Sequence, residues 1–399
     1  MKKTIILAVI LILAVLTLNI ISSKEIKFNN EEVNNKINDE IRGIYISYIE
    51  YQKYFDNKND EEIRIEIDKM INNIHDNKFN LIILHVRPFS DSVYKSNIFP
   101  YSYTVSGKEG KEQLDVLDYF IEKSHKLNIK IYAWINPYRI RNTTDIKNIS
   151  IENPCYKWLG TDKVKIIKDK GIFYNPSSSE VEELIVNGVE EIVKNYDVDG
   201  IHFDDYFYPS DDIDNNNYQK YVNSGGKLTL KEYRYEIVNN MIKKVYKTIK
   251  DIDKNIIFSI APDGNIDNNY NYNMADILTW LSNDNYVDYI IPQIYYGFNN
   301  SNRPYVRTLI EWNNYIKNDN IKLLPALAFY KIGNIDEFAG IGINEWLNSK
   351  NIIANQIKVS RNMNKYSGFI LFRYDSYFEN SEIVSSERKE FLKMIDLTF

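Results

Sequence analysis

Cysteine is nearly absent from this chain, which has one, Cys155, among 399 residues. A single cysteine can form neither an intrachain disulfide nor a cysteine-based zinc site. Long basic runs are absent too, and the net charge is −6. Because nucleic-acid binding relies on clustered lysine and arginine, this charge balance argues against a nucleic-acid partner.

Aromatic residues, in contrast, are plentiful. They make up 14% of the chain, which contains 32 tyrosines. A tyrosine ring offers a flat apolar face and a hydroxyl group, so it makes a good wall for a carbohydrate site. The remaining composition, 44% hydrophobic and 26% charged, is ordinary for a globular protein of one large domain or two modest ones.

The amino terminus has the pattern of an export signal. Lys2 and Lys3 precede an uncharged, largely apolar run over residues 4–23. This run is also long enough to span a bilayer, so residues 1–23 are expected to be either a cleaved signal peptide or a retained anchor. Residues 24–40 are expected to be a polar spacer. Both alternatives place the rest of the chain outside the membrane, either extracellular or at the cell surface, with membrane contact only through the N-terminal segment.

From residue 41 onward, short apolar runs alternate with longer amphipathic segments, as in repeated βα units. Residues 63–74 carry apolar side chains at helical spacing, and further helices are expected at 230–252, 272–283, 303–318, 343–363 and 385–397. The predicted strands are Ile41–Tyr48, Asn80–Val86, Ile129–Ile135, Asp199–Asp205, Ile256–Pro262, Val287–Ile294, Lys322–Phe329 and Ser367–Arg373.

Eight strands that alternate with helices predict an α/β fold, a (β/α)8 TIM barrel over residues 41–399. Pro325 fits less well, because it interrupts a strand that should have neighbours on both sides. The connections after the second, third and fourth strands are about 20 to 40 residues long, more than an ordinary loop needs. In a barrel, such loops build the substrate cleft.

The fourth predicted strand ends in two adjacent carboxylates, Asp204 and Asp205, followed by the aromatic run Tyr206-Phe207-Tyr208. An unpaired buried carboxylate is costly, so the arrangement suggests charge delivered to a cleft. A solvated Asp-Asp turn is the alternative. Pleat alternation predicts that His202 and Asp204 face the cleft and that Asp205 turns at its rim.

Polar and aromatic side chains at the other strand ends should converge on the same cleft. Hydrolysis of a glycosidic bond needs one protonated carboxyl group and a second group that stabilises or attacks the oxocarbenium-like carbon. A nearby histidine or arginine would keep one carboxylate ionised, and aromatic burial would raise the pKa of the other. The candidate catalytic residues are Asp204, Asp205 and Asp263. The candidate substrate-binding residues are His85, Arg87, Trp134, Asn136, Tyr138, His202, Tyr206, Tyr208, Gln293 and Tyr295.

Several of these residues have a structural alternative. His85 and His202 could simply hydrogen-bond the backbone, Arg87 could form a structural salt bridge, and Asp263 could be a turn former. His85, His202 and Asp204 could also form a facial metal triad. We expect no metal and no cofactor. Which aspartate is the acid, and whether the reaction is retaining or inverting, stays open at this point.

The chain resembles the glycosyl-hydrolase-like 10 family of bacterial envelopes. The matching segments are Arg42-Gly43-Ile44-Tyr45, His85-Val86-Arg87-Pro88, Tyr132 to Arg139, Tyr174-Asn175-Pro176, Asp199 to Pro209, Ser259 to Asn265, Ile291 to Tyr295, and Arg234. Many members have Ser-Pro-Phe-Gly or Ser-Pro-Ser-Gly where this chain has Ala261-Pro262-Asp263-Gly264. This difference puts a general catalytic role for Asp263 in doubt.

The resemblance implies a barrel, an envelope location and glycan hydrolysis, and some members act on peptidoglycan strands that lack stem peptides. We therefore expect an exported, monomeric glycoside hydrolase with a cell-envelope polysaccharide as its partner. Two alternatives remain. Asp199 to Tyr206 echoes the chitinase pattern Asp-Gly-x-Asp-x-Asp-x-Glu, although His202 and Tyr206 stand where Asp and Glu belong, which leaves a substrate-assisted hydrolase. The chain could also be a non-catalytic module that binds cell-wall glycan.

Overall fold

The structure is a computed structural model, and it describes residues 39–396. Within these residues no helix is long and apolar enough to cross a membrane. The expected signal or anchor at residues 1–23 lies outside the described residues, as does most of the expected spacer at 24–40.

Nine strands form one parallel sheet, in the spatial order β10-β9-β8-β7-β3-β2-β1-β12-β11. The first and last strands of the chain are neighbours, because β1 pairs with both β2 and β12. The sheet strands are β1 (Ile41–Ile46), β2 (Leu81–Arg87), β3 (Lys130–Ile135), β7 (Gly200–Phe203), β8 (Ile257–Ile260), β9 (Tyr289–Ile290), β10 (Lys322–Leu323), β11 (Ala326–Ala328) and β12 (Gly368–Phe372).

The expected seventh strand is present as two halves that flank Leu324 and Pro325. Its first half, β10, pairs with β9, and its second half, β11, pairs with β12. The amide of Leu324 donates to the carbonyl of Ile290, and the amide of Ile370 donates to the carbonyl of Pro325. The interrupted strand therefore joins β9 to β12 and closes the ring, which confirms the (β/α)8 barrel.

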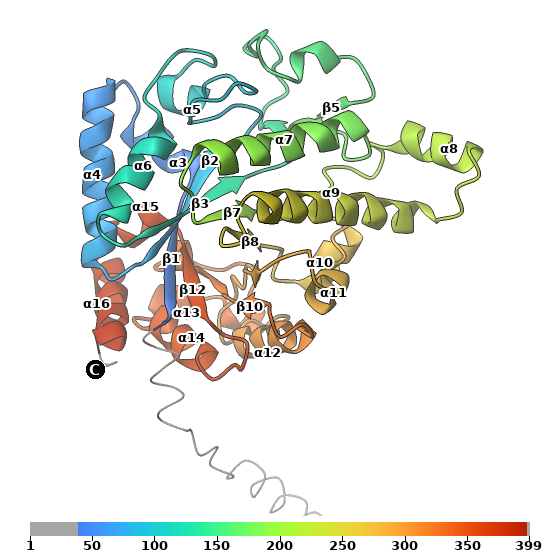
Figure 1. Cartoon of the computed structure of the whole chain (residues 1–399). Helices are drawn as coiled ribbons and strands as arrows, with labels where there is room; N and C mark the ends of the chain where they lie inside the picture. Colours follow the sequence, from blue (N-terminus) through green and yellow to red (C-terminus); the bar gives the residue numbers. More distant parts are fainter. Residues whose placement is uncertain (1–38, 397–399) are drawn as a thin grey trace, which may run out of the picture. The chain divides into compact units, whose positions relative to one another are not determined.

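Helices pack around the outside of this ring (Figure 1). Their apolar stripes match the predicted periodicity, as in α4, where Ile63, Ile67, Met70, Ile71 and Ile74 are the buried residues. The helices are α3 (Tyr48–Tyr54), α4 (Asp60–Asp76), α6 (Val116–His125), α7 (Ser179–Asn195), α9 (Leu230–Ile252), α10 (Ile266–Asn271), α11 (Ile277–Ser282), α12 (Tyr305–Tyr315), α13 (Glu345–Asn348), α14 (Ile352–Ser360), α15 (Tyr374–Tyr377) and α16 (Glu382–Asp396), with 3-10 turns η2 (Phe329–Lys331) and η3 (Gly340–Gly342).

Helix boundaries follow capping more closely than hydrophobic periodicity. The predicted helix 230–252 coincides with α9, which begins with a capping box formed by Thr229 and Glu232. The predicted helix 343–363 was wrong as a single element, because Ser349 is extended and the chain forms α13 and α14 instead. Likewise, the expected helix 272–283 is only α11, since Asp276 caps a later start through the amide of Thr279.

The three long connections carry their own structure. The one after β2 holds α5 (Tyr103–Ser106), and the one after β7 holds α8 (Asn215–Asn223). The one after β3 holds η1 (Tyr156–Trp158) and a small antiparallel sheet of β4 (Arg139–Arg141), β6 (Gly171–Tyr174) and β5 (Val164–Ile167), in that order. These loops follow the carboxyl ends of their strands, so they stand around the mouth of the barrel.

Two hydrophobic clusters fill the molecule. The larger lies between the sheet and the helices. The smaller fills the barrel interior and includes Tyr45, Ile83, Trp134, Leu324 and Ile370. At the other end of β1, Glu40 is buried, and it accepts hydrogen bonds from Arg361 and from the hydroxyl of Tyr366. The barrel is thus packed below its mouth, and polar chemistry concentrates at the strand ends.

Candidate active site

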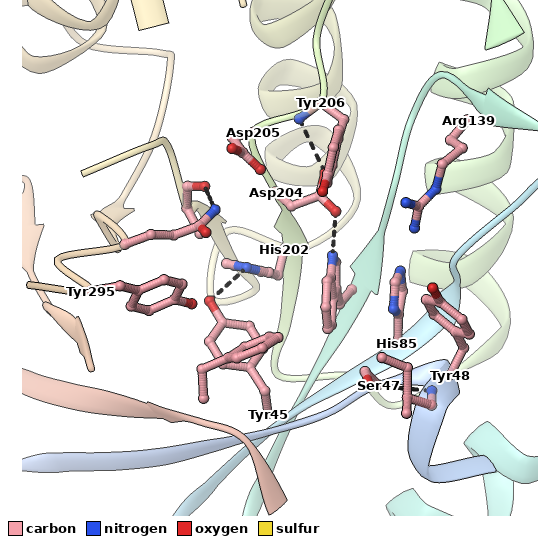
Figure 2. A pocket seen from close by; sticks show the side chains of 15 residues that line it. Tyr45, Ser47, Tyr48, His85, Arg139, His202, Asp204, Asp205, Tyr206 and Tyr295 are labelled. Carbon is pink, nitrogen blue, oxygen red and sulfur yellow. Dashed lines mark hydrogen bonds between the residues drawn. The ribbon is translucent and has the colours of Figure 1, made fainter. Parts of the chain in front are cut away.

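A cavity of about 210 Å³ opens at the carboxyl ends of the strands (Figure 2). Eight of the predicted site residues line it: His85, Trp134, His202, Asp204, Asp205, Tyr206, Gln293 and Tyr295. They come from β2, β3, β7 and the segments that follow β7 and β9. The cavity therefore brings together residues that are far apart in the sequence, as the barrel predicts.

A row of rings crosses three neighbouring strands at the base of the cavity. Strand register places Trp134 between His85 and His202. The indole stacks face to face on His85, with centroids 3.5 Å apart and planes 6° from parallel. Its centroid lies 6.3 Å from that of His202. The indole therefore separates the two histidines that the facial triad would bring onto one metal ion, and residues 39–396 contain no cluster of three ligands that could hold a metal.

His202 is a neutral, doubly hydrogen-bonded group. Its Nε2 lies 3.1 Å from the Tyr45 hydroxyl, and its Nδ1 lies 2.9 Å from the Ser259 hydroxyl. Burial lowers the pKa of His202 to about 3. An uncharged imidazole does not supply the positive charge that could keep a carboxylate ionised. Its hydrogen bonds fix its position beside the acidic pair.

His85 differs from His202 in its hydrogen bonding. The side chain is fully buried, and neither Nδ1 nor Nε2 has a hydrogen-bond partner in the described part of the chain. Burial, with the positive charge of Arg139, lowers its pKa well below the ordinary value. Unpartnered polar atoms in such a place are costly, and His85 lines the cavity. The backbone-capping alternative finds no support here.

Asp204 is buried and held by neutral donors. Trp134 Nε1 donates to its Oδ2 at 3.1 Å, and Asn136 Nδ2 donates to the same oxygen at 3.3 Å. The amide of Tyr206 donates to Oδ1 at 3.4 Å. Burial raises the pKa of Asp204 to about 6, and the charge of Arg139 and these hydrogen bonds limit the rise. Asp204 is therefore largely ionised at neutral pH.

Asp205 lines the same cavity but is half-buried, in keeping with the predicted position at the rim. Burial raises the pKa of Asp205 to about 7, and the negative charges of Asp204 and Asp263 add to the rise. The amide of Gln293 is the main group that opposes it. The two adjacent carboxyl groups thus differ: one is surrounded by donors and faces a cation, and the other faces negative charge.

Arg139 supplies the positive charge in the cavity, and sequence reasoning did not select it. Its guanidinium lies over three rings, 5.8 Å from the centroid of Tyr48, 5.0 Å from that of Phe89 and 5.1 Å from that of Tyr206. Nε donates to the carbonyl of Pro88 at 3.4 Å. These rings hold the cation near Asp204 without an ion pair. The position, two residues beyond Pro137 at a strand end, was the available signal.

The end of β1 was also missed. Tyr45, Ser47, Tyr48 and Ile49 line the cavity, as does Phe372 at the end of β12. Ser47 caps α3 together with the buried Glu50, and Arg373 lies 3.3 Å from that carboxylate. This network fixes the corner at which β1 turns into α3. The Ser-x-x-Glu pattern of a capping box was its sequence signal.

The remaining five predicted site residues do not line the cavity. Asn136 supports Asp204 from behind, as described above. Asp263 accepts from the amide of Asn265 at 2.7 Å and from Asn268 Nδ2 at 2.9 Å, as a turn former does. Arg87 is buried against the Phe99 ring, and Tyr138 is buried in the larger core cluster. Tyr208 donates to Asp214 Oδ2 at 2.8 Å.

The fold and the cavity together define the class of protein, a (β/α)8 barrel with the carboxylate and aromatic groups of a glycoside hydrolase at its mouth. The chain belongs to the Glycosyl hydrolase-like 10 family, whose sequence model matches residues 40–339. The resemblance to this family is thereby confirmed.

Two curated relatives are also named as glycosyl hydrolases. Glycosyl hydrolase YngK of Bacillus subtilis is 32% identical over 296 residues, which cover 69% of this chain and 57% of the relative. Glycosyl hydrolase DigH of Escherichia coli K12 is 29% identical over 330 residues, 74% of this chain and 72% of the relative. This chain therefore spans little more than half the length of YngK.

A solved structure supports the fold. The PgaB (BpsB) glycoside hydrolase domain from Bordetella bronchiseptica superposes with a TM-score of 0.57 at 11% identity. The match covers 88% of this chain and 99% of that domain. At this identity the likeness concerns the fold alone.

Proposed function

We propose that the protein is an exported glycoside hydrolase that cleaves a cell-envelope polysaccharide, with peptidoglycan strands that lack stem peptides as its substrate. The observation that carries the hydrolytic chemistry is the pair Asp204 and Asp205, which share one cavity and have different surroundings. Family membership and the barrel support the reaction class. The resemblance in sequence supports the polymer, and the apolar run at 4–23 supports the location.

In this proposal Asp205 is the general acid and Asp204 stays ionised. The proton of the Asp205 carboxyl passes to the glycosidic oxygen as the bond from that oxygen to the anomeric carbon breaks, and the bonding electrons stay with the oxygen. The Asp204 carboxylate stabilises or attacks the positive carbon. Water then adds there, and its released proton returns to Asp205, which restores the starting state.

The uncharged groups of the cavity orient the sugar. His85 offers two unpartnered nitrogens to a hydroxyl group, and Tyr206, whose side chain is 51% exposed, offers a ring face. The buried rings of Tyr45 and Trp134 and the partly buried ring of Phe372 exclude water from the reacting carbon on the β1 side. Exclusion of water strengthens the charge interactions on which the mechanism depends.

The decisive experiment measures the release of reducing ends from denuded glycan strands by the full-length chain, purified in detergent because residues 4–23 are apolar. Hydrolysis is expected, with Asp204→Asn and Asp205→Asn each slower by about 100- to 10,000-fold. A chain that binds the strands but releases no reducing ends would instead be a glycan-binding module. Unchanged turnover in both variants would refute the assigned carboxylates.

A second substrate separates the two roles. An aryl glycoside with a p-nitrophenolate leaving group needs no proton to depart. Asp205→Asn should therefore lose no more than about tenfold on it, while Asp204→Asn should remain as impaired as on the natural strands. If Asp204→Asn instead shows the small loss and Asp205→Asn the large one, Asp204 is the general acid. The chitinase-like alternative requires an acid at position 206. Partial burial and the charges of Asp205 and Asp204 raise the pKa of Tyr206 to about 12, which disfavours it.

A further inference from the structure

A second cavity, of about 650 Å³, lies beside the catalytic one. We call it the side cavity. The two share Arg139 and Tyr206, so the side cavity continues the catalytic cavity across the loops after β3, β7 and β8. Its lining consists of Arg139, Lys170, Phe173, Tyr206, Tyr208, Pro209, Ser210, Asp211, Arg234, Asn271, Tyr272, Asn273 and Met274.

The walls of the side cavity present rings to solvent. Tyr206 is 51% exposed and Tyr272 is 71% exposed, and among the described tyrosines these two are the most exposed. Phe173, Tyr208 and Met274 form a buried apolar base. Exposed rings around an apolar hollow are the surface on which the faces of sugar rings pack.

The cations that line the side cavity differ in exposure and in partners. Arg139 is half-buried among aromatic rings, whereas Lys170 is exposed. Arg234 is bound to Asp214 through Nε at 2.9 Å and Nη2 at 2.7 Å, so its charge is compensated. Lys170, at the end of the turn between β5 and β6, donates to the carbonyl of Pro209 at 3.1 Å. Within residues 39–396 it forms no ion pair. Because an ammonium group has three donors, Lys170 can bind an anionic ligand without giving up this contact.

We propose that the side cavity binds the sugar unit adjacent to the cleaved bond and that Lys170 recognises a carboxylate on that unit. This inference rests on the proposed function, and it adds the chemistry of the neighbouring sugar. In strands without stem peptides, the muramic acid unit carries a free lactyl carboxylate. The exposed rings take the sugar faces, and the ammonium group selects the acidic unit over a neutral one.

The test measures binding, so that it does not depend on turnover. The full-length chain with Asp204→Asn is titrated with denuded glycan strands, with the same strands after chemical reduction of their carboxyl groups to alcohols, and with oligogalacturonate. Reduction should weaken binding about tenfold, and Lys170→Gln should weaken binding of the unreduced strands by about the same factor. Lys170→Gln should leave binding of the reduced strands unchanged.

Lys168→Gln is the matched control, because Lys168 is an exposed lysine of the same hairpin turn that does not line the side cavity. It should bind all three probes like the parent. Tyr272→Ala should weaken the reduced and unreduced strands equally, by about fivefold to tenfold, because it removes a stacking face and no charge. Oligogalacturonate binding that exceeds strand binding and is lost in Lys170→Gln would assign the site to uronic acids and overturn the lactyl assignment.

The inference fails if Lys170→Gln and Lys168→Gln behave alike, or if the effect of Lys170→Gln is the same on reduced strands. Failure of the proposed function is a different result. In that case the chain with Asp204 intact binds the strands with the expected carboxylate dependence and releases no reducing ends.

Discussion

Two buried aspartates in the same stretch of chain have opposite surroundings. Asp214 accepts two hydrogen bonds from Arg234 and one from the Tyr208 hydroxyl, and it is 1% exposed. Asp204 is 4% exposed, and it accepts hydrogen bonds from two neutral side chains and a backbone amide. Arg139, the cation whose charge acts on Asp204, lies over aromatic rings instead of pairing with it.

The difference separates structural charge from functional charge. A buried carboxylate with a bidentate arginine is compensated, and its removal leaves a buried cation. A buried carboxylate that lacks such a partner destabilises the folded state when it is ionised, and selection keeps it for reaction or binding.

The largest effect should come from exchanging each aspartate for asparagine. Asp204→Asn should lower kcat/KM about 1,000-fold, because it removes the anion opposite the developing positive charge, while its melting temperature stays at or above that of the parent. Asp214→Asn should do the reverse, losing stability and retaining most of its specific activity per folded molecule. Calorimetry and initial rates on the same samples give both quantities. Similar melting temperatures in the two variants would break the comparison.

Removal of Arg234 should mainly reduce stability, whereas removal of Arg139 should mainly reduce activity. Arg234→Met leaves Asp214 buried without its cation and should cost about 3–5 kcal/mol in the free energy of unfolding, measured by urea denaturation. Arg139→Met removes ring contacts and one long hydrogen bond to the carbonyl of Pro88, and it should cost less than about 2 kcal/mol. Its main effect should be on activity, since the pKa of Asp204 then rises. A larger stability loss in Arg139→Met than in Arg234→Met would show that Arg139 is structural.

The pH dependence follows from the raised pKa values of the acidic pair. kcat/KM should be bell-shaped, falling below about pH 6 as Asp204 gains a proton and above about pH 7 as Asp205 loses one. Both values lie above those of unfolded aspartate, so the folded state binds more protons between about pH 4 and 7. The stability from these groups is therefore present at low pH and lost as pH rises through 6 to 7. Asp204→Asn should show a flatter dependence of melting temperature on pH.

The smallest effect should come from one hydrogen bond. Trp134→Phe removes the indole donor to Asp204, so the acid limb of the pH profile should move upward by a few tenths of a pH unit, with a loss of activity of a few fold. Trp158→Phe is the control, because Trp158 lies on η1, away from the catalytic cavity. An acid limb that does not move in Trp134→Phe would mean that Asn136, Arg139 and the amide of Tyr206 hold Asp204 without the indole.

Much of this architecture could be predicted from the sequence. The alternation of apolar runs with amphipathic helices was sufficient for the barrel, because most strands are short apolar runs that are followed by an amphipathic helix. Pleat alternation also placed His202 and Asp204 correctly. The positional prediction for Asp205 held because the strand ends at Phe203 and the next two residues leave the sheet.

The rest depended on geometry that sequence spacing does not contain. Arg139 reaches the cavity because β4 begins there and turns the chain back, which a strand-end count does not reveal. Tyr138, one residue earlier, points into the core for the same reason. Asp263 was a catalytic candidate beside Asp204 and Asp205, with a turn former as its alternative. Its carboxylate is taken up by Asn265 and Asn268, and that competition becomes visible only when the loop is built.

The division of the seventh strand gives the ring a preferred place to open. β9 and β10 share two register pairs, whereas β2 and β3 share six. Amides on both sides of Pro325 should therefore exchange with solvent deuterium sooner than those of β2 and β3. Gln293, which lines the catalytic cavity, bridges to Ala326 across this seam. A saccharide bound at Gln293 would hold the seam closed. Binding at the active site should therefore slow deuterium exchange of the amides on both sides of Pro325.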